Sequence, residues 1–127
     1  MPITFTKHME DGYFQTKFVG KISKAELVPS YRIFFEGADW SPGLSELADL
    51  SDADLSEVDA EAVSSLMEYS ERHYQANHTT NVKVAIYAPH DLGFGLSRMY
   101  SMLAEQSPEV VAVFRSLSDA QHWLAKK

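Results

Sequence analysis

The greatest density of chemically active side chains in this sequence lies between residues 49 and 61. Six carboxylates fall there, and they are Asp49, Asp52, Asp54, Glu57, Asp59 and Glu61. Such a run can bind a divalent cation, supply catalytic acids or mark the start of a helix. A calcium loop of the EF-hand kind needs a glycine at its bend, and this run has none. Acidic residues in a first helical turn cap its free amides and complement the helix dipole. The pattern therefore favours capping and solvated surface first, partner contact second, and metal binding or catalysis last.

Ser51, Asp52 and His90 offer the sharpest catalytic hypothesis. Ser51 and Asp52 end one predicted strand, and His90 follows the next strand along the chain. Because the carboxyl ends of parallel strands share the sheet edge where ligands usually bind, these side chains are expected near one another. No G-x-S-x-G motif or evident oxyanion donor accompanies them, and "GFG" lacks the third glycine of a dinucleotide fingerprint. We therefore expect a protein that is not an enzyme and uses no cofactor, and a small hydrolase is the third hypothesis.

The bulk composition predicts one ordinary globular domain over residues 1–127. The length of 127 residues and the hydrophobic content of 45% suffice for a single core. A net charge of −7 argues against binding to nucleic acid or anionic lipid. The chain has no cysteine, which excludes disulfides and thiolate metal sites. The sequence pattern shows neither a leader segment nor a membrane span, so a cytoplasmic protein is expected.

Alternating and apolar segments predict five strands. Polar and apolar residues alternate over 3–8 and 13–20 around a turn, which predicts an antiparallel hairpin. Three more apolar segments, rich in β-branched residues in the last two, predict strands over 44–51, 81–88 and 109–116.

Helical spacing of apolar residues predicts four helices, over 23–37, 57–77, 90–106 and 118–127. Ser23 with Glu26 and Ser118 with Gln121 have capping-box spacing, and Pro29 predicts a kink or a later start in the first helix. The order is β-β-α-β-α-β-α-β-α. It predicts an α/β domain with a five-stranded mixed sheet, parallel except for the N-terminal hairpin. A homodimer is plausible, because edge strands need covering.

The order of these elements, together with four local segments, resembles the SpoIIAA-like fold of STAS domains and of small bacterial STAS/SEC14-like proteins. "FVGKISKAE" resembles the strand-glycine-helix entry of the family, and "LADLSDAD" resembles its central strand. "VKVAIYA" is similar to the following strand, and "VAVFRSLSDAQHWL" is similar to the final strand and helix. The likeness covers nearly the whole chain.

The resemblance implies a binding or regulatory role. In anti-sigma-factor antagonists of this family, a phosphorylated serine follows an aspartate at the start of the helix after the central strand. Asp59 matches that aspartate, whereas the serine positions hold Ala60 and Glu61. The resemblance therefore implies either a permanently charged imitation of the phosphorylated state or no switch. The SEC14-like relatives suggest a lipid or another apolar ligand.

We therefore predict a non-enzymatic STAS-like module that binds a protein partner or a small ligand through the carboxyl-end edge of its sheet. The residues expected to form that surface are Asp52, Asp59, Glu61, His90 and Phe94. The first alternative is a carrier of a lipid or small apolar ligand. It requires an enclosed cavity of a few hundred Å³ between the sheet and the first helix, near Tyr31 and Phe35.

Overall fold

Five strands form one mixed sheet in the computed structural model, which describes residues 2–126. They lie side by side in sequence order: β1 (Ile3–His8), β2 (Tyr13–Lys21), β3 (Ser45–Asp54), β4 (Val82–Tyr87) and β5 (Glu109–Phe114). β1 and β2 are antiparallel, and the other three neighbouring pairs are parallel. The predicted mixed sheet with an N-terminal hairpin is confirmed.

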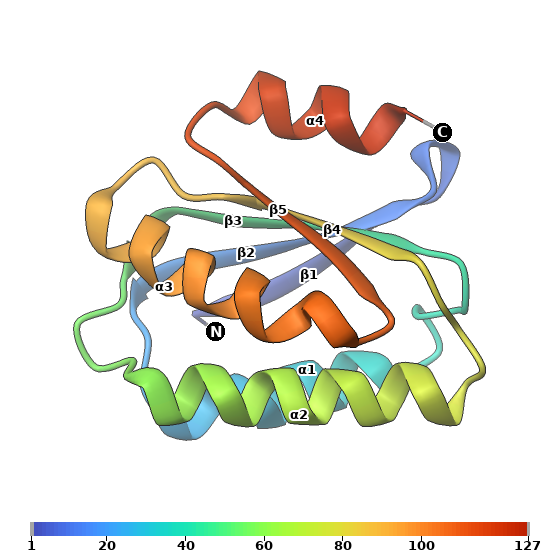
Figure 1. Cartoon of the computed structure of the whole chain (residues 1–127), viewed down its shortest axis with the longest axis horizontal. Helices are drawn as coiled ribbons and strands as arrows, with labels where there is room; N and C mark the ends of the chain where they lie inside the picture. The colour runs from blue at the N-terminus through green and yellow to red at the C-terminus, as the bar shows by residue number, and fades with distance from the viewer. Residues whose placement is uncertain (1, 127) are drawn as a thin grey trace.

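Helices cover both faces of this sheet, and the two faces are covered unequally. The helices are α1 (Lys24–Phe35), α2 (Ala60–Ala76), α3 (Asp91–Leu103) and α4 (Leu117–Ala125), with short 3-10 turns η1 (Met9–Asp11) and η2 (Ala104–Gln106). α4 lies alone on one face, and α1, α2 and α3 lie on the other (Figure 1). No helix within residues 2–126 combines the length and the apolar character that crossing a membrane requires.

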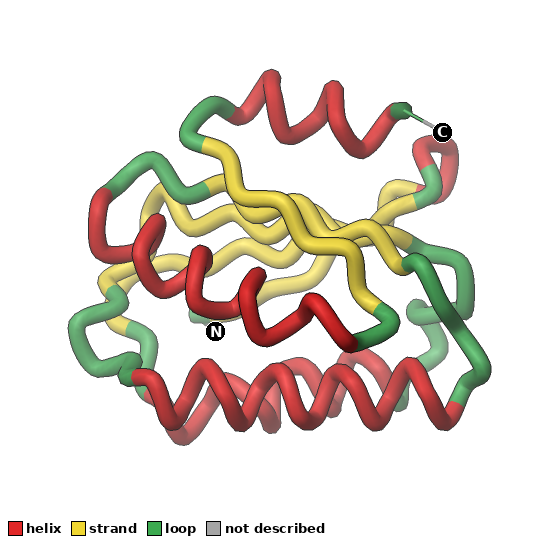
Figure 2. Tube along the Cα trace, viewed as in Figure 1, coloured by secondary structure: helices red, strands yellow, loops and turns green. Residues whose placement is uncertain are grey.

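Each of the four helices begins at the same edge of the sheet. β2, β3, β4 and β5 lead in turn into α1, α2, α3 and α4, and the connections gather at the left of Figure 2. We call this side the carboxyl-end edge, because the parallel strands end there. The edge therefore brings together residues near 20, 54, 90 and 116, which the sequence separates widely.

Alternation along the strands divides the core between the two faces. Phe14 of β2 is fully buried, and its ring centroid lies 4.7 Å from that of Phe34 on α1. Leu47 of β3 belongs to a smaller apolar cluster on the other face, with Ala85 of β4 and Ala120 of α4. This period-two alternation is the physical basis on which the hairpin was predicted.

The third strand is longer than predicted, and this changes the setting of the carboxylate run. β3 continues through Asp54, because β2 resumes its pairing after an irregularity between Lys17 and Val19 and pairs Lys21 with Asp54. The prediction that the strand ends at residue 51 and a loop follows is therefore wrong. Asp52 and Asp54 lie on a paired strand.

Three helix starts also test the predicted caps. The Ser23–Glu26 capping box is present at the start of α1, and that helix runs through Pro29 without beginning anew there. α2 begins at Ala60 rather than 57, after its N-cap Asp59. The box predicted at Ser118 is wrong, because Ser116 is the N-cap of α4 and accepts from the N–H of Asp119.

Candidate functional site

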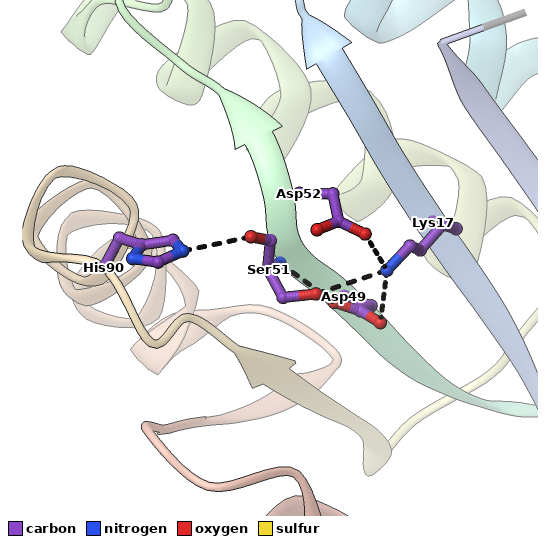
Figure 3. A network of polar contacts seen from close by, with 5 residues as sticks. All are labelled: Lys17, Asp49, Ser51, Asp52 and His90. Atoms are coloured by element: carbon purple, nitrogen blue, oxygen red, sulfur yellow. Dashed lines mark hydrogen bonds and ion pairs between the residues drawn. The ribbon is translucent and has the colours of Figure 1, made fainter.

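Lys17 on β2 is the centre of a polar network at the carboxyl-end edge. Its Nζ lies 3.0 Å from Asp49 Oδ2, 3.0 Å from Asp52 Oδ2 and 3.2 Å from Ser51 Oγ (Figure 3). Partial burial lowers the pKa of Lys17, but the hydrogen bonds and charges of Asp49 and Asp52 outweigh it and raise the pKa. Lys17 therefore stays protonated at neutral pH and cannot act as a general base.

Asp49 completes this network and holds the Ser51 hydroxyl. Its Oδ1 accepts from Ser51 Oγ over 2.7 Å and from the Ser51 N–H over 2.9 Å. Burial raises the pKa of Asp49, but the Ser51 hydrogen bonds and Lys17 together lower it below its usual value. A carboxylate with a lowered pKa is a weak base, so Ser51 is not activated as a nucleophile.

His90 does not join a catalytic arrangement with Ser51 and Asp52. Its Nε2 lies 3.0 Å from the main-chain carbonyl oxygen of Ser51, so this nitrogen donates to the carbonyl. The Ser51 hydroxyl points away from His90, toward Lys17 and Asp49 (Figure 3). The Ser51/His90/Asp52 arrangement is wrong, because β3 presents its carbonyl and its side chain in different directions.

Asp59 serves as a helix cap, and Glu61 lies beside it on the surface. Asp59 Oδ1 accepts from the N–H of Ala62 over 2.9 Å, and Asp59 Oδ2 lies 3.1 Å from Lys24 Nζ. The Ala62 N–H and Lys24 both lower the pKa of Asp59. Glu61 is exposed in the first turn of α2. The structure thus confirms that the C-terminal end of the carboxylate run, Asp59 and Glu61, lies at the start of a helix.

The other two acids in the run also have local contacts. Asp54 accepts from the N–H of Ser56 over 3.0 Å, and Glu57 lies 3.6 Å from Lys21 Nζ. Within residues 2–126, no group of three or more His, Cys, Asp or Glu side chains is arranged to hold a metal ion.

Phe94 is half-buried and packs against the main core. The guanidinium of Arg115 lies 4.2 Å from its ring centroid and also pairs with Asp91 Oδ1 at 2.9 Å. Phe94 is therefore an anchor between α3 and the end of β5, and its ring is partly covered by Arg115.

A surface pocket of about 140 Å³ opens beside His90. The end of β3 and the residues after it contribute Leu50, Ala53, Asp54 and Leu55, and the start of α3 contributes His90, Leu92 and Gly93. Gly93 also lines it, and a Cβ added there would reach ordinary van der Waals contact with Leu55 Cδ1 at 3.5 Å and with Leu50 Cδ1 at 3.7 Å. His90 and Asp54 both line this pocket. The side chain of Asp52 instead pairs with Lys17, and the side chain of Asp59 caps the start of α2.

A second polar group lies inside the molecule, and the sequence reasoning missed it. Glu46 on β3 is buried, and its Oε2 accepts from Thr16 over 2.7 Å and from Tyr31 over 2.6 Å. Burial raises the pKa of Glu46, and these two hydrogen bonds partly oppose that rise. The sequence feature that could have indicated this buried acid is the glutamate within the apolar segment "LSELADL". A charge buried in such a strand is costly unless it is paired or hydrogen-bonded.

Glu109 at the start of β5 is the second buried acid. The Tyr100 hydroxyl lies 2.9 and 3.2 Å from its two oxygens. Burial and the nearby charge of Glu46 raise the pKa of Glu109 to about 8. The corresponding sequence feature for Glu109 is an acid directly before an apolar segment, in "EVVAVF".

The cavity expected for a lipid carrier is smaller than that hypothesis requires. The hollow near Tyr31, between the sheet and α1–α3, holds about 90 Å³ and is not lined by Phe35. A larger hollow of about 390 Å³ lies between β1 and α1, but it is open to the surface and neither Tyr31 nor Phe35 lines it. A carrier of long apolar ligands requires several hundred Å³. The prediction of a cavity of that size is therefore wrong.

Comparison with known proteins shows the fold. No family model matches this sequence, and no curated protein matches it. Among solved structures, it is similar to an uncharacterized protein of the DUF3478 family with a SpoIIAA-like fold, from Shewanella loihica PV-4. The identity is 21%, the match covers 96% of this chain and 91% of that chain, and the TM-score is 0.59. The chain therefore has the SpoIIAA-like fold that its sequence resembles.

Proposed function

We propose that this protein is a non-enzymatic binding module that holds a protein partner at its carboxyl-end edge. The observation that carries this proposal is the pocket of about 140 Å³ between the end of β3 and the start of α3. Its walls combine leucine and alanine side chains with Asp54 and His90, and Leu92 at its rim is 51% exposed. An apolar side chain of the partner would fill such a pocket and bury the rim.

The charge of the same edge favours a basic partner. Four carboxylate side chains there are at least half exposed, Asp52, Glu57, Asp59 and Asp91, and each forms an ion pair with a lysine or arginine of the same edge. Glu61 adds a further exposed acid, and the whole chain carries −7. With Asp54 and Glu61, which are also exposed, the acids of this edge outnumber those four bases. A net charge of one sign steers a partner of opposite sign, and salt screens that attraction. The partner would therefore combine lysine or arginine with one inserted apolar side chain.

The polar network around Lys17 supports a binding role over catalysis. Lys17 holds its proton, and Asp49 and Ser51 form hydrogen bonds to each other on a rigid strand. The edge thereby gains a fixed shape, which lowers the entropic cost of binding. At the position of the switch serine of regulatory STAS domains, Glu61 would keep the surface permanently acidic.

Affinity capture from the source cell, with quantitative mass spectrometry, tests this proposal. Full-length protein is compared with Gly93→Ala, which narrows the pocket, and Gly95→Ala, whose added methyl meets nothing within 4 Å. A second pair compares Glu61→Lys at the edge with Glu105→Lys on η2.

The expected result is one basic protein retained by the unchanged chain, by Gly95→Ala and by Glu105→Lys. Gly93→Ala and Glu61→Lys should each retain it several-fold less, and 0.5 M salt should release it, since a Debye length of roughly 4 Å screens the edge. Equal retention by both members of each pair would refute the proposal.

A further inference from the structure

A surface groove of about 390 Å³ lies between the edge strand β1 and the helix α1. Ile3 and Phe5 form its wall on β1, and Ile33 and Phe34 form its wall on α1. Ile33 is 69% exposed, although it is a large aliphatic residue. Apolar surface of this kind, rimmed by polar side chains such as Asp39, is typical of a groove that binds a ligand or a partner.

The strand β1 leaves one side of its backbone without a partner. It comes first in the order of the sheet and pairs only with β2. The N–H of Val19 donates to the carbonyl of Pro2 over 2.8 Å, one pair beyond that of Ile3. In an antiparallel pair, residues that bond to the neighbouring strand alternate with residues whose N–H and C=O point away from it. Pro2 is of the first kind, so Ile3, Phe5 and Lys7 are of the second.

The outward backbone groups and the groove belong to the same residues. Ile3 and Phe5 direct N–H and C=O groups to the open side of β1, and both residues line the groove. A strand added beside β1 would place every second side chain on the face that holds the groove, because side chains alternate along a strand. An extended peptide adds to a sheet edge in this way, with hydrogen bonds to its backbone and pockets for its alternate side chains.

The charge beside the groove favours a basic peptide. Asp39 is the one charged residue among those that line it. Asp39 is exposed, and none of the ion pairs between residues 2–126 includes it. The whole chain carries −7, so a second copy would be repelled, whereas a basic peptide would be attracted.

We propose that the groove between β1 and α1 binds an extended basic peptide, which adds to the sheet as a strand beside β1. Two apolar side chains of the peptide, two positions apart, enter the groove, and a lysine or arginine pairs with Asp39. The residues that line this groove all differ from those that line the pocket beside His90. The proposal therefore does not depend on the partner proposed for the carboxyl-end edge.

Titration of the full chain with short peptides, followed by backbone amide NMR, tests this site. The probe is the acetylated and amidated heptapeptide KTVTLTK, whose valine and leucine lie two positions apart. It should give saturable shifts at Ile3, Phe5 and Lys7 and at Ile33 on α1. The same peptide with glutamate in place of both lysines should bind at least fivefold more weakly. A version N-methylated on its three central residues should bind at least tenfold more weakly, because it lacks the N–H groups that would pair with β1.

Two pairs of variants separate strand addition from other modes of binding. Lys7→Pro removes an outward N–H and keeps the pairing with β2, since an edge strand tolerates proline where the nitrogen faces solvent. Lys7→Met keeps that N–H. Ser30→Phe places a ring in the groove, whereas Ala25→Phe places it at an exposed position of α1 that does not line the groove.

The first member of each pair should bind the lysine peptide at least tenfold more weakly than the unchanged chain does. Lys7→Met and Ala25→Phe should bind it as the unchanged chain does. Asp39→Asn should bind the lysine and glutamate peptides equally well.

Three results would overturn the proposal. One is the absence of saturable shifts with the lysine peptide. Another is equal binding of the N-methylated peptide, which would mean that the groove takes apolar groups without strand pairing. The third is a dimer of the unchanged chain, seen in sedimentation, that Lys7→Pro dissociates, because a second copy would then occupy the edge. Retained binding in Ser30→Phe would also count against the site, and this variant decides the outcome even where Lys7→Pro does not fold.

Discussion

The imidazole of His90 donates to the main-chain carbonyl of Ser51 across 3.0 Å, and so it joins the start of α3 to the end of β3. The Ser51 hydroxyl is engaged elsewhere, with Asp49. Residues that look catalytic in sequence are therefore structural contacts that fix the shape of the carboxyl-end edge.

Lys17→Met should destabilise the protein much more than Lys21→Met does. Lys17 pairs with Asp49, whose side chain is only 8% exposed, and removing it leaves a mostly buried carboxylate with Ser51 alone. The expected loss is about 1–3 kcal/mol of unfolding free energy. Lys21 and Glu57 are both more than half exposed, so their ion pair should contribute little. Urea unfolding at pH 7 measures both variants, and similar midpoints would contradict this reading.

Asp59→Ala should lower Tm by a few degrees, because the first turn of α2 loses its side-chain cap. Asp59→Asn should keep most of the stability, since asparagine caps equally well. The pKa of Asp59 is lowered by the Ala62 N–H and Lys24. The stabilisation of the folded protein by the Asp59 carboxylate is therefore fully present above the usual pKa of an aspartate. It is lost as the pH falls through the lowered pKa of the folded state. Thermal scans should show that the Tm difference between Asp59→Ala and the unchanged protein shrinks as the pH falls below the usual pKa of an aspartate, about 3.9. A difference that is constant with pH would count against the cap.

Glu109 should make the protein less stable as the pH rises from about 5 to 8. Its pKa is raised to about 8 in the folded protein, whereas in the unfolded chain it titrates near about 4.3. Between these values the folded state binds more protons, so stability falls with increasing pH.

Glu109→Gln supplies the control for this pH dependence. It keeps an acceptor for Tyr100 and removes the titration. It should flatten the decline in Tm between pH 5 and 8 and should make the variant the more stable protein above pH 8. A parallel decline in both proteins would show that another group is responsible.

Gly93→Ala and Gly95→Ala should both stabilise the chain, each by about 0.5–1 kcal/mol, because alanine favours a helix over glycine. Both glycines lie in α3, and neither has a positive φ. The methyl added at 93 reaches ordinary contact distance from Leu55 and Leu50, so it fits without a clash. Urea unfolding checks the gain, and destabilisation by Gly93→Ala alone would mean that the pocket wall cannot accept a methyl group.

Sequence patterns determined the strands, the helices and their order, because these depend on local spacing. Alternation in β2, the Ser23–Glu26 box and the helical stripe of α2 are properties of neighbouring residues. The SpoIIAA-like fold, the N-terminal hairpin and a helix start within the carboxylate run were predictable for that reason. The C-terminal end of β3 and the start of α4 were not predictable in this way. Pairing with β2 extends β3 to Asp54, and α4 is capped by Ser116, two residues before the predicted cap.

Only the tertiary structure decided which way the functional side chains point. Ser51 and His90 do meet, as the sheet edge predicted, but through a carbonyl rather than a hydroxyl. Lys17 lies 32 positions from Asp49 in sequence, and parallel pairing of β2 with β3 brings them within 3.0 Å. Glu46 and Glu109 are brought under three helices by the same sheet, where burial raises the pKa of each. Contacts of this kind depend on chain packing over long separations, which local spacing does not encode.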